Sequence, residues 1–129
     1  MLAEIVRLGL KNFSADSPQI LEAMRRVEVV TADYLNYLKS AAENSFDVVY
    51  FDPMFRRPLE KSSGINPIRS IADHSALSLQ AVKEACRVAK NFVVMKENSR
   101  SEEFSRLGFK IADGGKYSSI SFGLIDCQE

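Results

Sequence analysis

Hydrophobic residues occur along this chain in two kinds of pattern, short uninterrupted runs and segments with a spacing of three or four residues. Uninterrupted runs at 46–51 and 91–95 are rich in β-branched and aromatic residues, which predicts two buried strands. A shorter run at 27–30 predicts a strand that precedes them. Helices are predicted from the three- or four-residue spacing at 2–12, 20–24, 34–44, 67–72, 78–90 and 101–107.

The chain ends in a predicted hairpin. Its strands lie at 109–111 and 120–125, and the turn-forming residues 113–116 separate them. Before the hairpin, strands alternate with helices, an order typical of α/β folds with a mostly parallel sheet. A length of 129 residues suits one domain with a single core. We therefore expect an α/β domain with a mostly parallel sheet and a C-terminal antiparallel hairpin at its edge.

The overall charge indicates no particular partner. Lys and Arg together number 17, as do Asp and Glu, so the net charge is zero and any contact with a nucleic acid must be local. The only cysteines, Cys86 and Cys127, are too few for a disulfide framework and predict reduced thiols. No apolar stretch has the length of a membrane span or the form of a targeting segment. We expect a cytoplasmic protein without a membrane partner.

Polar residues follow each of the predicted parallel strands. Asp52 comes directly after the run at 46–51, and ligands of open α/β sheets bind beyond the carboxyl ends of the strands. The alternative for Asp52 is that Asp-Pro only turns the chain. Asp33 follows the run at 27–30, with a plain helix N-cap as its alternative. Lys96 follows the run at 91–95.

A segment without periodicity, rich in Pro, Gly and charge, follows Phe55 as far as Pro67. It predicts a loop above the end of the strand at 46–51. Its basic residues, with one just beyond it, form the only basic cluster near that strand end and suit phosphate contacts: Arg56, Arg57, Lys61 and Arg69. The alternative is a solvated loop with incidental charge.

The four residues Asp52, Pro53, Met54 and Phe55 combine groups that together suit an exocyclic base amine. They offer a carboxylate acceptor, a carbonyl acceptor held by a rigid ring, an apolar side chain and an aromatic face. Two acceptors on the amine hydrogens turn its lone pair toward an electrophile, while the aromatic ring stacks on the base. The reaction that this arrangement indicates is methyl transfer to nitrogen.

These four residues resemble the Asp/Asn-Pro-Pro-aromatic motif of class I S-adenosylmethionine-dependent amino-methyltransferases. The longer stretch 48–55 resembles more closely the small-subunit ribosomal RNA guanine-N2 methyltransferases and their relatives, in which Val-Val-Tyr and a hydrophobic residue precede Asp-Pro-Met-Phe. The resemblance extends to 26–33, 92–96 and 116–123. It implies a Rossmann-like fold, S-adenosylmethionine as the cofactor and ribosomal RNA as the partner.

The resemblance also implies roles for individual residues. Asp33 and Tyr34 would contact the cofactor, and so would Asp52. Asp52 and the Pro53 carbonyl would hold the target amine, with Met54 and Phe55 completing the catalytic motif and Phe55 stacking on the base. Arg56, Arg57 and Lys96 would bind the substrate.

The start of the chain departs from that family. The family fold begins with a strand, a glycine-rich turn that binds the cofactor, a helix and a second strand, and none of these is present here. The two missing strands lie between the third and fourth strands of the family sheet, so their loss leaves a gap of about 14 Å, three spacings of about 4.8 Å. The strand at 27–30 then pairs directly with the strand at 46–51, or is displaced, or a second copy or partner chain completes the sheet. We expect 1–129 to be one truncated methyltransferase domain with weak or absent cofactor affinity of its own.

Two other functions fit parts of the sequence. A phospho-acceptor receiver domain has a similar length, and Asp52 and Lys96 would be its phosphorylated acid and its lysine, but the acidic pair that such domains need for magnesium is missing near the N-terminus. The other alternative is a non-catalytic remnant that keeps the fold and a partner surface.

Overall fold

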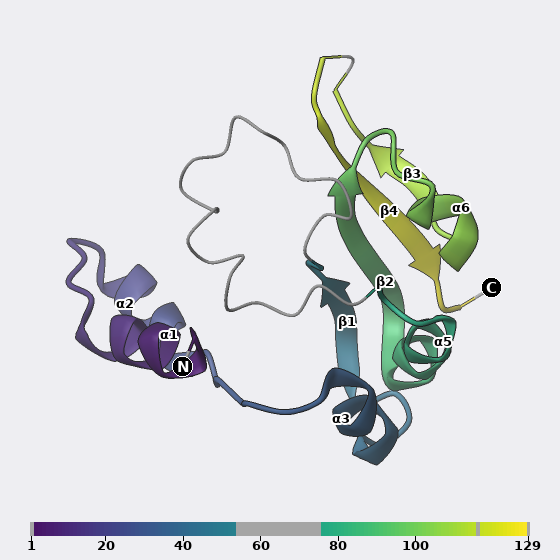
Figure 1. Cartoon of the computed structure of the whole chain (residues 1–129). Coiled ribbons are helices and arrows are strands. Elements are labelled where there is room, and N and C mark those ends of the chain that lie inside the picture. The colour runs from purple at the N-terminus through teal and green to yellow at the C-terminus, as the bar shows by residue number, and fades with distance from the viewer. Residues whose placement is uncertain (1, 54–75, 116, 129) are drawn as a thin grey trace. The chain divides into compact units, whose positions relative to one another are not determined.

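A computed structural model describes residues 2–53, 76–115 and 117–128 of the chain (Figure 1). The chain divides into two compact units, Met1–Ala32 and Asp33–Glu129. The expectation that all 129 residues form one partial domain stays a prediction.

The first unit is a pair of helices, α1 (Leu2–Asn12) and α2 (Pro18–Arg26), which pack against each other. Ser17 caps α2 by accepting a hydrogen bond from the Ile20 amide, and Pro18 occupies the first helical position, where no amide donor is needed. Both predicted helices are confirmed, and α2 is longer than the predicted turn. Neither helix has a fully buried residue.

The prediction of a strand at 27–30 is wrong. These residues are extended after α2 but join no ladder in the described part of the chain. The carbonyl of Val29 instead accepts a hydrogen bond from Arg7 of α1, at 3.2 Å. A run of β-branched residues becomes a strand only when a second strand pairs with its backbone, and no described strand does so here.

The second unit contains a four-stranded sheet in the order β1-β2-β4-β3 (Figure 1). Its strands are β1 (Phe46–Phe51), β2 (Ala89–Asn98), β3 (Lys110–Asp113) and β4 (Ile120–Asp126). β1 pairs with β2 in parallel, whereas β4 is antiparallel to both β2 and β3. The prediction of an α/β fold with a C-terminal hairpin is confirmed. The prediction of a mostly parallel sheet is wrong, because only β1 and β2 are parallel and the hairpin of β3 and β4 makes the rest of the sheet antiparallel.

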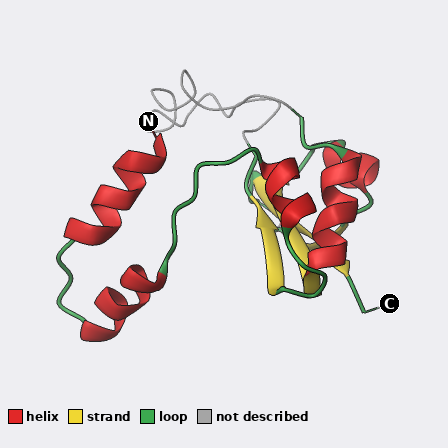
Figure 2. Cartoon of the chain, turned by 90° about the horizontal axis from the view of Figure 1, so that it is seen from below, coloured by secondary structure: helices red, strands yellow, loops and turns green. Residues whose placement is uncertain are grey.

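Three helices of this unit lie on the same face of the sheet: α3 (Tyr34–Ser40), α5 (Leu79–Val88) and α6 (Glu103–Leu107) (Figure 2). Together with the facing strands they bury one apolar cluster, made of Leu38, Leu77, Ala81, Val82, Ala85, Val88, Ala89, Val93, Met95, Phe104, Leu107 and Phe109. The predicted helix at 67–72 lies outside the described residues.

The helix boundaries are partly as predicted. Gly108 ends α6 in a left-handed conformation with φ of 82°, as expected for a glycine at this position. The helix predicted at 34–44 ends earlier, at Ser40, and α5 ends at Val88 because β2 begins with the next residue. Leu79 is half exposed, because it lies in the first turn of α5.

Arg87 joins α5 to the end of α3. Its Nη2 atom donates to the carbonyls of Leu38 and Ala41, each at 2.9 Å, and its Nε atom donates to Glu84 at 2.8 Å. The last carbonyls of a helix have no partner within the helix, so a guanidinium placed there satisfies them. The contact fixes α3, and with it the chain that enters β1.

β1 is less buried than its sequence predicts. Val49 and Phe51 face the helices and are half-buried, whereas Val48 and Tyr50 point to the other face and are exposed. The unbroken apolar run correctly predicted a strand. Such a run is typical of strands that are buried on both faces of a sheet, however. Among the described residues, helices cover one face only, and β1 has a strand neighbour on one side only.

Cys86 and Cys127 are free thiols, and the thiol of Cys127 donates a hydrogen bond to the Ile125 carbonyl at 3.9 Å. Burial, and then the neighbouring Cys127, raises the pKa of Cys86 from 9.0 to about 11. The folded protein therefore keeps a proton that the unfolded chain releases near pH 9. Because the unfolded chain binds fewer protons between pH 9 and about 11, the free energy of unfolding should fall across this range.

Urea unfolding at several pH values checks this expectation. Cys86→Ala should flatten the loss of stability between pH 9 and about 11 relative to the unsubstituted chain. Equal slopes for the two proteins would contradict the raised pKa.

Candidate functional site

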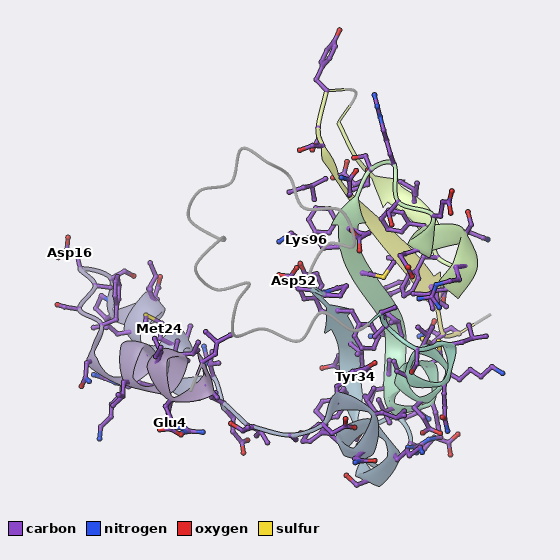
Figure 3. All side chains as sticks on the ribbon, viewed as in Figure 1. Glu4, Asp16, Met24, Tyr34, Asp52 and Lys96 are labelled. Carbon is purple, nitrogen blue, oxygen red and sulfur yellow. The ribbon has the colours of Figure 1, made fainter. Side chains whose placement is uncertain are left out.

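The candidate site lies at the carboxyl end of β1, where Asp52 meets Lys96 of β2. The parallel ladder ends at the pair Phe51 and Met95, so the next residue of each strand is Asp52 and Lys96. Lys96 Nζ lies 3.3 Å from Asp52 Oδ2, within hydrogen-bond distance (Figure 3). The structure thus brings together two residues that the sequence places 44 positions apart.

Both partners of this ion pair remain accessible. The side chain of Asp52 is 51% exposed and that of Lys96 is 28% exposed. An ion pair in contact with water contributes about 0–1 kcal/mol to stability, so the fold does not depend on it. Its main effect is to orient the carboxylate while leaving part of its surface open to a ligand.

Lys96 belongs to β2, although the sequence places it beyond the strand end. β2 continues to Asn98 because β4 pairs with it on the other side, with Lys96 opposite Phe122 and Glu97 opposite Ser121. The apolar run ends at Met95, where the parallel pairing with β1 also ends. The sequence therefore predicted where the parallel pairing of β2 with β1 ends. It missed the longer antiparallel pairing of β2 with β4.

Glu97 is a polar residue that the sequence analysis did not select. It is only 2% exposed, and its carboxylate accepts a hydrogen bond from the Asn98 amide at 2.8 Å. Ser121, opposite it on β4, is also buried and donates to Ser99 at 2.9 Å. The alternation of a strand would have placed Glu97 on the same face as Met95, which is the signal that could have found it.

The two predicted cofactor residues on α3 do not join this pair in the described structure. Asp33 accepts a hydrogen bond from the Asn36 amide at 2.9 Å, so its predicted role as an N-cap is confirmed. Tyr34 packs against the apolar core. Within the described residues, no hydrogen bond or ion pair links either residue to Asp52. Their contact with a cofactor stays a prediction.

The rest of the predicted motif lies largely outside the described residues. Pro53 is half-buried directly after Asp52. Four other predicted site residues, and the two further members of the basic cluster, fall in the stretch that the structure does not describe: Met54, Phe55, Arg56, Arg57, Lys61 and Arg69. Their roles in catalysis and substrate binding stay predictions.

The described pair can hold a polar group of a ligand. A carboxylate accepts hydrogen bonds from an amine or amide, and an ammonium donates to a carbonyl or phosphate oxygen. Across residues 2–53, 76–115 and 117–128, no three His, Cys, Asp or Glu side chains gather in a way that could hold a metal ion.

This geometry defines a small α/β unit with a four-stranded mixed sheet and an acid–lysine pair at the end of its parallel strands. No family model matches the chain. A similar protein is "Uncharacterized protein YpiP" of Bacillus subtilis (strain 168), which is 40% identical over 111 residues. The match covers 86% of this chain and 43% of the relative, so the chain spans less than half of the relative's length.

No helix in the part of the chain that the structure describes is long and apolar enough to cross a membrane. The expected cytoplasmic location stays a prediction.

Proposed function

We propose that this chain is part of a class I S-adenosylmethionine-dependent methyltransferase that modifies an exocyclic base amine, with guanine N2 of ribosomal RNA as the expected target. The observation that carries the proposal is Asp52, followed directly by Pro53, at the carboxyl end of a parallel strand. Lys96 lies 3.3 Å from its carboxylate. Asp52 is where an acceptor for a target amine is needed in an open α/β sheet.

In this proposal Asp52 and the Pro53 carbonyl accept the two hydrogens of the target amine. Its lone pair then points away from the acceptors and toward the methyl donor. S-adenosylmethionine, when bound, would supply an electrophilic methyl group to this nitrogen and leave as S-adenosylhomocysteine. The amine afterwards loses one proton to water. Lys96 holds Asp52 in place, and Phe55 stacks on the base.

The edge position of β1 is consistent with a truncated methyltransferase sheet. In the family that the motif resembles, the two strands absent from this chain lie beside the strand that carries the motif. A sheet without them ends at that strand, as the described sheet ends at β1. The residues present fit the cofactor only in part, because Asp33 caps α3, Tyr34 packs against the core, and no glycine-rich turn follows a strand near the start of the chain.

The receiver domain and the non-catalytic remnant, the two alternative functions, can be distinguished from this proposal. A receiver domain has a parallel, doubly wound sheet, and the antiparallel position of β4 between β2 and β3 argues against it. A non-catalytic remnant would have the same fold as the proposed methyltransferase. It would differ in that even the full-length protein would neither bind the cofactor nor transfer methyl groups.

Calorimetric titration with S-adenosylmethionine tests the proposal. We expect weak or undetectable binding to the 129-residue chain and micromolar binding to the full-length Bacillus subtilis relative, which should also transfer labelled methyl groups to ribosomal RNA. Acetyl phosphate with magnesium serves as the control for the receiver alternative. If the full-length relative fails to bind the cofactor, the proposal is wrong.

A further inference from the structure

The turn between β3 and β4 lies at the same edge of the sheet as Asp52. Because β4 runs antiparallel to β2, the turn that precedes β4 lies at the carboxyl end of β2, where β1 also ends (Figure 1). Phe122 of β4 is opposite Lys96, the partner of Asp52. Tyr117 precedes Phe122 by five residues, so at about 3.4 Å per residue the two lie at most about 17 Å apart. A ligand that is a polymer can therefore reach both the candidate site and this turn.

Hydrogen bonds fix the turn on the end of β2. The Ser99 amide donates to the Ser119 carbonyl at 3.0 Å, and the Ser99 hydroxyl donates to the Ser118 carbonyl at 2.9 Å. The Ser118 amide donates to the Gly115 carbonyl at 2.8 Å and closes the turn that contains Tyr117. The position of Tyr117 is thus set by the folded unit before any ligand binds.

Tyr117 is the most exposed large hydrophobic residue in the part of the chain that the structure describes, at 92%. Since so little of it is buried, its ring contributes little to the stability of the fold. A tyrosine offers a flat, rigid contact surface at a low cost in conformational entropy, which suits it to binding. Its exposure on a fixed turn therefore indicates a contact with a ligand.

A cationic residue adjoins the same turn. Arg100 directly follows Ser99, which bonds to the turn, and it is exposed. A guanidinium binds phosphate oxygens, and an aromatic ring stacks on unpaired bases. Proteins that bind single-stranded nucleic acids combine these two contacts.

We propose that Tyr117 and Arg100 form a binding element for single-stranded RNA beside the candidate site. Tyr117 stacks on an unpaired base near the modified nucleotide, and Arg100 contacts a backbone phosphate. The inference rests on the proposed function for the choice of RNA as the ligand. Double-stranded RNA fits less well, because its bases are already stacked on one another.

Tyr117→Trp converts the binding element into a fluorescent probe, because the chain contains no tryptophan. Titration of this variant with a single-stranded RNA oligonucleotide of mixed sequence should quench the indole emission, since the ring stacks on a base. The same sequence as a duplex should not quench it. Tyr37→Trp is the matched control, because Tyr37 is 43% exposed on α3, and its emission should stay constant.

Fluorescence anisotropy of the labelled oligonucleotide measures the affinity of further variants. Tyr117→Ala should weaken binding about 5–100-fold, whereas Tyr117→Phe, which keeps the ring, should stay within about twofold. Arg100→Gln should reduce the slope of log K against log salt concentration by about 0.7, the value for one phosphate contact on a single strand. Tyr117→Ala should leave this slope unchanged, because stacking releases no counterion.

Three outcomes would overturn the inference: no binding of the oligonucleotide by the chain, equal quenching in the two tryptophan variants, or equal affinity of Tyr117→Ala and the unsubstituted chain. The first would leave a protein as the ligand of the turn. RNA binding through Tyr117 without methyl transfer by the full-length Bacillus subtilis relative would keep the inference and remove the proposed function. Methyl transfer by that relative, with no loss of affinity in Tyr117→Ala, would do the reverse.

Discussion

Replacement of Asp52 by alanine is expected to lower the rate of methyl transfer by about 10²–10³-fold in the complete enzyme. In the proposed mechanism alanine removes the acceptor that orients the target amine, and it leaves Lys96 without its partner at 3.3 Å. Because the carboxylate is half exposed, the free energy of unfolding should change by less than about 1 kcal/mol. Single-turnover transfer of a labelled methyl group to RNA measures the rate, and urea unfolding measures the stability.

Asp47→Ala is the matched control for this experiment. Asp47 lies in β1, at the end of the strand opposite to Asp52, is 83% exposed and pairs with Lys90 at 4.0 Å. Its replacement should leave the transfer rate within twofold. Unchanged transfer in Asp52→Ala would refute the assigned role of the acid, while equal losses in both variants would indicate a general effect of charge.

The local features of the fold could be predicted from the sequence. Apolar runs identified β1 and the middle of β2, and Asp33 marked the start of α3 correctly. These signals act over a few residues, through backbone sterics and side-chain caps. They needed no knowledge of the rest of the chain.

Features that depend on distant partners could not be predicted in the same way. The run at 27–30 has the composition of a strand but joins no ladder in the described structure. The length of β2 depends on β4, some 25 residues later, and the exposure of Val48 depends on which neighbours the sheet has. Propensity reports how well a residue fits a strand, whereas pairing decides whether a strand forms.

In the candidate site, too, local features could be predicted from the sequence, whereas contacts between distant residues could not. The sequence placed Asp52 and Lys96 after two apolar runs, and the common edge of parallel strands made their proximity a reasonable expectation. Their contact requires that β1 and β2 be direct neighbours in register, which only the structure shows. Glu97 was missed because the apolar run ended before it, although its alternation with Met95 placed it on the buried face.

Gly123 is a further position whose importance comes from its neighbours. It lies in β4, opposite Met95, on the face that α6 covers. A Cβ atom at this position would lie 2.6 Å from Cδ1 of Phe104 and 2.8 Å from Cβ of Phe109. Both aromatic residues are buried and cannot move away without repacking the core. Gly123→Ala should therefore lower the free energy of unfolding by roughly 1–3 kcal/mol, as measured by urea unfolding.

Gly115→Ala distinguishes this steric effect from a general intolerance of alanine in the hairpin. Among the described residues, a Cβ atom at Gly115 would meet Cβ of Ser118 alone, at 3.7 Å, which is an ordinary contact. Its substitution should change the free energy of unfolding by no more than about 0.5 kcal/mol. Similar stability of the two variants would mean that α6 does not pack on β4 as described. A large loss in Gly123→Ala alone would show that the close contact between α6 and the sheet depends on the missing side chain, so that glycine in the middle of this strand is required by packing rather than by a turn.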